Sequence, residues 1–190
     1  EAFADLKGKR VNFGEPGSGQ FLTMQNLLRA AGWSMSDFAE VTDLSPRDQA
    51  KALCDGKIDA YAYMVGHPNV STSEASILCS IKFVAIEGDK VEKLLADKPY
   101  YEKAFVPAET YLRGAERTPS FGTKALLVTS DQVAAEDVYR LTKAVFERLN
   151  SLKERHPALS GLQPDQMLEG HSAPFHEGAE RYFRERGWIE

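Results

Sequence analysis

Residues 6–21, LKGKRVNFGEPGSGQF, decide the fold of this chain. Val11 and Phe13 alternate with polar neighbours, which predicts a strand over residues 11–13. Four residues that break regular structure follow the strand: Gly14, Pro16, Gly17 and Gly19. From Ser18 onward, apolar residues recur at helical spacing until Gly32. A strand, a glycine-rich loop and a helix in this order predict the first half of a βαβ unit.

The same alternation continues along the chain. Further strands are predicted at residues 41–42, 58–64 and 81–86, with the second of these buried on both faces. Helices are predicted after the Ser45-Pro46 cap, from Ser71, and over residues 88–104. Strands that alternate with helices form mainly parallel sheets with right-handed crossovers. We therefore predict an α/β fold.

The last third of the sequence has a different pattern. Two extended stretches, FVPAETYLRG and SFGTKALLVTS, precede a long helix predicted over residues 131–152. That helix carries an apolar face made of Val138, Leu141, Val145 and Leu149. Short helices are predicted near residues 163–169 and 177–186. The polar, turn-rich stretch 113–119 is the candidate boundary between two structural parts.

Composition excludes several classes of protein. The 190 residues carry a formal net charge of -5, which gives no general attraction to nucleic acid or anionic lipid. No apolar run approaches the roughly 20 residues that a membrane span requires. The chain begins at Glu1 rather than Met, so we expect a processed or trimmed protein, with any signal peptide already removed.

The glycine-rich loop is the first candidate binding site. Unpaired N–H groups and the positive dipole end at a helix start attract anions, and glycines allow close approach to the backbone. Gly17, Ser18 and Gly19 are the candidate contacts. The loop is neither a P-loop nor a dinucleotide fingerprint, since Gln20-Phe21 replaces the Lys-Ser/Thr pair and the glycine spacing is wrong. A tight strand-to-helix turn without a ligand is the alternative.

The second candidate is the loop after the predicted strand 58–64, with Gly66, His67 and Asn69. Ligands of parallel α/β sheets bind beyond the carboxyl ends of the strands, so this loop and the glycine loop are predicted to meet at one crevice. His67 could equally be a loop histidine without a ligand. Tyr111 could bind a ligand through its phenol hydroxyl, although the sequence pattern by itself favours a role in packing alone.

Signs of catalysis are missing from the sequence. It contains neither a nucleophile elbow nor an HExxH motif. The histidines are scattered, and the pair His171 and His176 lacks nearby Cys or Asp ligands for a metal. We predict a protein that binds without catalysing, and that needs neither cofactor nor metal. Cys54 and Cys79 are read as two buried small residues, with one structural disulfide in an oxidising compartment as the alternative.

Several segments together resemble the TAXI family, the substrate-binding receptors of TRAP transporters. They are LKGKRVNFGEPGSGQ, LCDGKIDAYAYMVGHPN, FVPAETY, KALLVTS and EGHSAPFHEGAERYFRERGW, in family order from Leu6 to Trp188. The resemblance implies a two-lobed periplasmic binding protein of the second type, which hands its cargo to a sodium-coupled membrane transporter. It also implies a small anionic ligand such as glutamate, another acidic amino acid or a dicarboxylate.

The resemblance also assigns residues and domains. It implies ligand contacts from the two loops above, and from Thr110 and Tyr111 in the turn that matches the family's PAGTY motif. Glu109 stands where the family has glycine. Residues 6–118 then form a complete lobe, the second, and residues 119–190 the C-terminal portion of the first lobe.

This division leaves part of the first lobe without its strands. We therefore expect an exposed apolar helix face and, if nothing precedes Glu1, either self-association of the chain or a poorly ordered C-terminal part. A sensor domain of a signalling system on the same fold is the alternative function, and a gene or segment encoding a transporter or a kinase beside it would decide between them.

Overall fold

The computed structural model describes residues 2–190. The chain divides into two compact units, of which the first ends at Thr123 and the second is Lys124–Glu190. The β5 strand, Thr118–Gly122, pairs with β4, Glu102–Val106, and so belongs to the first unit. The assignment of the two parts to particular lobes of a clamp stays a prediction.

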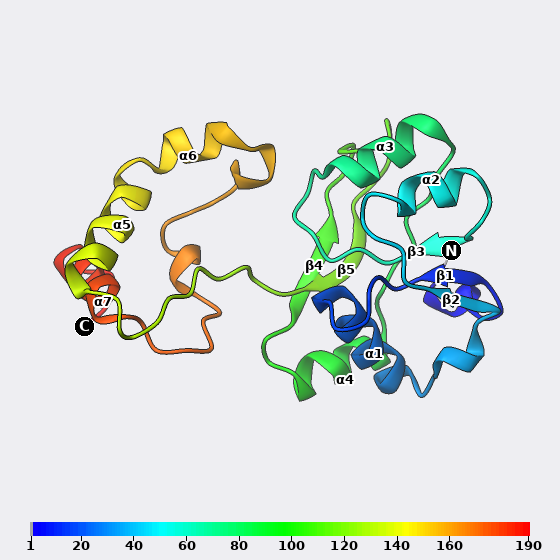
Figure 1. Cartoon of the computed structure of the whole chain (residues 1–190), viewed down its shortest axis with the longest axis horizontal. Helices are drawn as coiled ribbons and strands as arrows, with labels where there is room; N and C mark the ends of the chain where they lie inside the picture. Colours follow the sequence, from blue (N-terminus) through cyan, green and yellow to red (C-terminus); the bar gives the residue numbers. More distant parts are fainter. Residues whose placement is uncertain (1) are drawn as a thin grey trace. The chain divides into compact units, whose positions relative to one another are not determined.

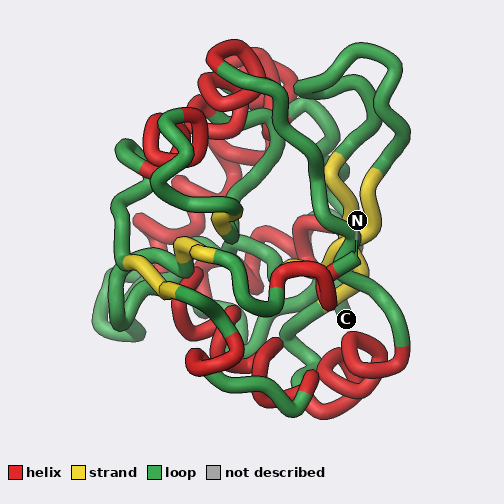
Figure 2. The backbone as a smooth tube through the Cα atoms, turned by 90° about the vertical axis from the view of Figure 1, so that its right-hand side faces the viewer, coloured by secondary structure: helices red, strands yellow, loops and turns green. Residues whose placement is uncertain are grey.

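A three-stranded parallel sheet lies at the centre of the first unit. Its order is β2-β1-β3, with β1 at Arg10–Asn12, β2 at Glu40–Thr42 and β3 at Ala60–Tyr61. Val11 of β1 aligns with Val41 on one side and with Ala60 on the other. The predicted parallel pairing of the first three strands is therefore confirmed. Figure 2 shows how short these strands are beside the loops that join them.

Helices cover both faces of this sheet. Figure 1 shows α1 (Gly19–Ala31) and α4 (Asp89–Asp97) together on one side, and α2 (Gln49–Cys54) and α3 (Val70–Leu78) together on the other. Val11 and Phe13 belong to the buried apolar cluster formed with α1 and α4. Because side chains alternate along a strand, Asn12 faces α2 instead. Two 3-10 helices complete the unit: η1 (Phe3–Leu6) and η2 (Met35–Asp37).

Three predictions for this unit were wrong. Residues 81–86 form no strand: Ala85 makes an isolated bridge with Ala2 and the amide of Ile86 donates to the carbonyl oxygen of Pro119, but no continuous ladder forms. The β3 segment is half-buried rather than buried on both faces, since it lies at an edge of the three-stranded sheet. Helix α4 ends before Pro99, and Glu102–Val106 forms β4, which pairs antiparallel with β5 instead of continuing the helix.

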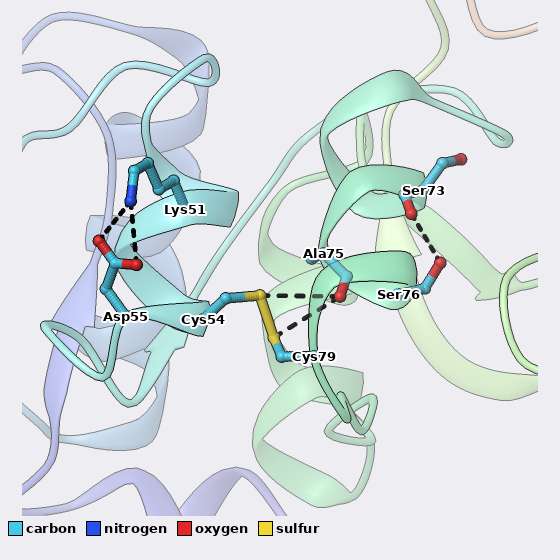
Figure 3. The surroundings of a disulfide bond; sticks show 7 residues. All are labelled: Lys51, Cys54, Asp55, Ser73, Ala75, Ser76 and Cys79. Atoms are coloured by element: carbon cyan, nitrogen blue, oxygen red, sulfur yellow. Dashed lines mark hydrogen bonds and ion pairs between the residues drawn. A yellow bond between two sulfur atoms is a disulfide. The ribbon is translucent and has the colours of Figure 1, made fainter.

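A disulfide joins Cys54 at the end of α2 to Cys79 just after α3. Both sulfur atoms lie near the carbonyl oxygen of Ala75, as Figure 3 shows. The favoured reading of two free buried cysteines is therefore wrong, and the alternative is confirmed. The bridge closes a sequence separation of 25 residues, for which the chain-entropy model gives a stabilisation of roughly 2–4 kcal/mol.

The second unit is helical. It contains α5 (Ala135–Glu147), α6 (Leu149–Arg155), η3 (Pro157–Leu159), η4 (Gln166–Leu168) and α7 (Glu177–Glu185). Gly178 lets α7 pack directly on α5, since a Cβ atom there would lie 2.1 Å from the carbonyl oxygen of Ala135. Aromatic rings fill the space around this contact: Phe146, Phe175, Tyr182, Phe183 and Trp188.

The predicted long helix is broken at Arg148, whose φ of -111° and ψ of 24° separate α5 from α6. The predicted apolar face is also not uniformly buried. Val138 and Leu149 are buried, whereas Leu141 is 51% exposed. Leu127 and Val128 are exposed as well, in a segment without regular structure. Self-association through these side chains stays a prediction. Among residues 2–190, no helix has the length and apolar character needed to cross a membrane.

Candidate functional site

The glycine loop, residues 14–18, leads from β1 into α1. Gly14 and Gly17 have φ values of 81° and 86°, in the left-handed region that favours glycine. Ser18 caps the helix, and its Oγ accepts a hydrogen bond from the amide of Phe21 at 3.1 Å. The predicted helix start at Ser18 is confirmed. The amides of Gly19 and Gln20 open the helix and therefore have no intrahelical acceptor.

The side chain of Asn12 fixes the glycine loop by hydrogen bonds. Its Oδ1 accepts hydrogen bonds from the amides of Gly14 at 3.3 Å and Leu44 at 2.8 Å. Its Nδ2 donates to Gln49 Oε1 at 3.2 Å. Asn12 and Gln49 are fully buried. This buried network ties the loop after β1 to the loop after β2 and to α2, so the helix start is held by the core.

A cavity of about 640 Å³ opens beside the helix start. Gly14, Ser18 and Gly19 line it from the glycine loop and α1, and Tyr63 and Met64 line it from the segment after β3. Because β1 and β3 are adjacent parallel strands, both segments leave the sheet at its carboxyl edge. The predicted meeting of the glycine loop with Gly66–Asn69 at one crevice stays a prediction, since Tyr63 and Met64 line the cavity from this side and Gly66, His67 and Asn69 are not among its described lining residues.

Gln20 is the unusual polar residue of the cavity wall. Its side chain is 8% exposed, and its Nε2 is a buried donor without a hydrogen-bond partner among the described residues. The amide packs over Gly14, where a Cβ atom would come within 2.7 Å of Nε2. Leaving a buried donor unpaired costs about 1–3 kcal/mol. An acceptor supplied by a ligand at this place would recover that cost.

A second group of polar residues continues the wall along α1. Thr23 and Asn26 lie one and two turns after Gly19 on the same helix face. Both bond the hydroxyl of Tyr101, with Asn26 Nδ2 at 3.1 Å and Thr23 Oγ1 at 3.2 Å. Tyr100 and Tyr101 place their rings 4.6 Å apart between centroids. This tyrosine pair is thereby fixed against the helix.

The other candidate loop forms a separate group, the Tyr111 cluster, made of His67, Asn69 and Tyr111. The Tyr111 hydroxyl accepts from the backbone amide and from Nδ2 of Asn69, both at 2.9 Å. Both of its lone pairs are then in use, so its proton is donated to His67 Nδ1 at 2.8 Å. The Oδ1 of Asn69 caps α3 by accepting from the amide of Thr72.

Burial affects the titration of this cluster. Loss of solvent lowers the pKa of His67 below its usual value, because the charged imidazolium is disfavoured. The pKa of Tyr111 is raised by the same effect. Both groups are therefore neutral at pH 7, in agreement with the hydrogen bond from the phenol to the imidazole.

The predicted site residues thus separate into two sets. Ser18 and Gly19 line the cavity, whereas the remaining six are not among the described residues that line it: Gly17, Gly66, His67, Asn69, Thr110 and Tyr111. Thr110 Oγ1 lies 3.5 Å from the carbonyl oxygen of Ala108. Glu109 has a φ of 57°, in the left-handed region that favours glycine. Ligand contact by any of these residues stays a prediction.

Sequence reasoning missed most of the cavity wall. The polar stripe of Gly19, Thr23 and Asn26 was detectable, since these positions recur at helical spacing on the face away from the buried Leu28. Tyr100 and Tyr101 carry no local signal, because they reach the helix across more than seventy residues of chain.

The fold and the cavity define a class. A parallel α/β sheet with flanking helices, and a ligand-sized cavity beyond the carboxyl ends of its strands, is typical of small-molecule-binding α/β proteins. The chain matches the model of the NMT1-like family over residues 1–187, and it belongs to that family. The family falls within the periplasmic-binding-protein-like superfamily, which points to a solute-binding role, typically outside the cytoplasm.

Proposed function

We propose that this protein is an extracytoplasmic solute receptor that binds a small carboxylate at the start of α1 without converting it. The single observation that carries the proposal is the set of unused donors in the cavity wall. The amides of Gly19 and Gln20 open the helix, and Gln20 Nε2 is buried without a partner. The two amides lie at the positive end of a helix dipole, and together with the unpaired Nε2 of Gln20 they are donors that suit an anionic oxygen.

The energetic terms favour an anion here. The helix dipole contributes roughly 0.3–1 kcal/mol toward a negative charge, and up to about 2 kcal/mol in a partly buried site. Charge-assisted hydrogen bonds are roughly twice as strong as neutral ones. The described residues that line the cavity include Glu15 as a carboxylate but neither a histidine nor a cysteine that could act as a nucleophile or base, which supports binding without chemistry.

The partner is proposed from the resemblance. The segments quoted above look like those of TAXI receptors, which deliver their ligand to the membrane subunits of a TRAP transporter, and acidic amino acids and dicarboxylates are the ligands that this resemblance suggests. Membership of the NMT1-like family supports the transport role. The disulfide between Cys54 and Cys79 supports a periplasmic location, because such bonds persist in oxidising compartments.

A ligand screen tests the proposal. The full chain is heated with a panel of small carboxylates and with the uncharged amide of each acid. We expect carboxylates to raise the melting temperature and their amides to leave it unchanged, since only a negative charge engages the helix start. Chromatography of the incubated panel should show every compound intact. Equal shifts from the acids and the amides, or conversion of any compound, would contradict this function.

A further inference from the structure

Part of the cavity wall is made of large apolar and aromatic side chains. Leu22 is 52% exposed and Tyr100 is 49% exposed, and both line the cavity. Pro46, Tyr63 and Met64 extend the same wall. Contiguous apolar surface of this kind, left in contact with water inside a concave site, marks a place that a ligand covers.

The described residues that line the cavity include an acidic side chain but no basic one. Apart from the tyrosines, the ionisable side chain among them is that of Glu15, which is exposed. Neither lysine nor arginine is among those residues. A ligand with two carboxylates would place the second beside Glu15, against the apolar wall, or at Thr23 and Asn26, which already bond Tyr101. None of these positions favours a second charge, because like charges repel and a buried charge needs a partner.

The helix start accommodates one charged group. The amides of Gly19 and Gln20 point out of the first turn of α1, and the buried Nε2 of Gln20 adds a donor whose side chain is more than nine-tenths buried. A carboxylate has two oxygens and can accept from several N–H groups. One carboxylate therefore uses the donors that this end of the cavity leaves unpaired.

We propose that the cavity selects a monocarboxylate with an apolar, ring-sized body over a dicarboxylate. This inference rests on the proposed function and narrows its ligand class. The carboxylate binds at Gly19 and Gln20, and the body lies against Tyr100, Tyr63 and Leu22. The paired rings of Tyr100 and Tyr101 are inclined at 57° and offer both a face and an edge to an aromatic ligand.

Calorimetric titration of the full chain tests the proposal with four probes: phenylacetate, cyclohexylacetate, succinate and phenylacetamide. We expect both ring-bearing acids to bind at least about tenfold more tightly than succinate, because burying a ring against apolar side chains raises the affinity by more than about tenfold. Phenylacetamide should also bind at least about tenfold more weakly than phenylacetate, because it keeps the ring and loses the charge.

A wall variant separates ligand recognition from general damage to the fold. Tyr100→Ala should weaken phenylacetate about tenfold and leave succinate within about twofold, because only the ring uses this part of the wall. Ile77→Ala is the matched control: Ile77 is also an exposed large apolar residue of the first unit, but it lies on α3 and is not among the lining residues. The control should bind all four probes as the unchanged protein does.

The outcomes distinguish this inference from the function on which it rests. If succinate binds as tightly as phenylacetate, or if Tyr100→Ala weakens both acids equally, the ring-sized class is overturned while carboxylate binding stands. If no acid binds more tightly than phenylacetamide, the carboxylate site itself is wrong. If the ring-bearing acids alone bind and lose affinity in Tyr100→Ala, both proposals are supported.

Discussion

The loops that follow β1 and β3 begin at the same edge of one sheet but use their polar groups in opposite ways. The glycine loop presents the open amides of Gly19 and Gln20 to a cavity, together with an unpaired side-chain donor. The Tyr111 cluster uses its polar groups internally, since Tyr111 accepts twice from Asn69 and bonds His67. Position at the carboxyl edge therefore does not by itself identify a ligand site.

The two loops therefore contribute to different properties, the glycine loop to ligand affinity and the Tyr111 cluster to the stability of the fold. Where donors remain unpaired, a ligand gains hydrogen bonds without breaking any in the protein. Where a hydroxyl is already saturated, a ligand must displace existing partners, and each buried group left unpaired costs about 1–3 kcal/mol. We therefore assign ligand binding to the glycine loop and a structural role to the Tyr111 cluster. Four changes test that division, and they are given in order of decreasing effect.

Ser18→Asp should reduce the affinity for phenylacetate or any other bound carboxylate by about a hundredfold or more. The new carboxylate lies at the helix start and repels the ligand, while aspartate still caps α1, so the fold should be retained. Calorimetry measures the loss, and circular dichroism checks the fold. Ser36→Asp adds the same charge at an exposed position outside the cavity lining, and it should bind normally. Unchanged affinity in Ser18→Asp would exclude the site.

Tyr111→Phe should lower the free energy of unfolding by about 2 kcal/mol, because three polar groups of a half-buried cluster lose their shared partner. Carboxylate affinity should stay within about twofold. Urea denaturation gives the first value and calorimetry the second. Tyr100→Phe removes a phenol that is about half exposed and should change stability little. A large loss of affinity with little loss of stability in Tyr111→Phe would reverse the two roles.

Ser18→Ala should weaken carboxylate binding by about 1 kcal/mol, the value of one neutral hydrogen bond. Stability should fall by a similar amount, because the cap to the amide of Phe21 is lost. Ser18→Thr keeps the hydroxyl and serves as the control in both titration and denaturation. Should Ser18→Ala bind as poorly as Ser18→Asp, the loss would reflect a collapsed helix start rather than repulsion between charges.

The smallest effect concerns pH and the Tyr111 cluster. The pKa of His67 is lower in the folded protein than the usual 6.5 or so, so the unfolded chain takes up a proton first as the pH falls. Stability is thus greatest above about pH 6.5 and declines below it. Because the imidazole is only half-buried, solvent reduces the effect. Urea midpoints at pH 7.5 and 5.5 should differ more for the unchanged protein than for His67→Gln; equal differences would remove His67 from this account.

The local part of the fold was predictable from residues 6–21, since the strand, the left-handed glycines and the cap at Ser18 depend on near neighbours. Residues 81–86 show the limit. Their apolar composition fits a strand, but a strand needs a partner along its length, and here Ala85 makes an isolated bridge with Ala2 and Ile86 one backbone hydrogen bond with Pro119.

The same limit applies to the site. Ser18 and Gly19 were found because the helix start is encoded beside them. Gln20 directly follows Gly19, and that position was a signal that could have included it. The unpaired Nε2 that distinguishes Gln20, however, becomes visible only in three dimensions. Tyr100 was out of reach of any local pattern, since its place in the wall depends on the packing of Tyr101 against α1.

Backbone amide chemical shifts of the ¹⁵N-labelled full chain, followed during titration with phenylacetate and with phenylacetamide, show where the carboxylate binds. We expect phenylacetate to move the amides of Gly19 and Gln20 and the side-chain NH₂ of Gln20 the most, and to leave Asn69 and Thr72 in place. Phenylacetamide should produce none of these shifts at the same concentration. If the largest shifts fall instead at Asn69 and Thr72, with Gly19 and Gln20 unmoved, the ligand binds at the Tyr111 cluster and the glycine loop is not the site.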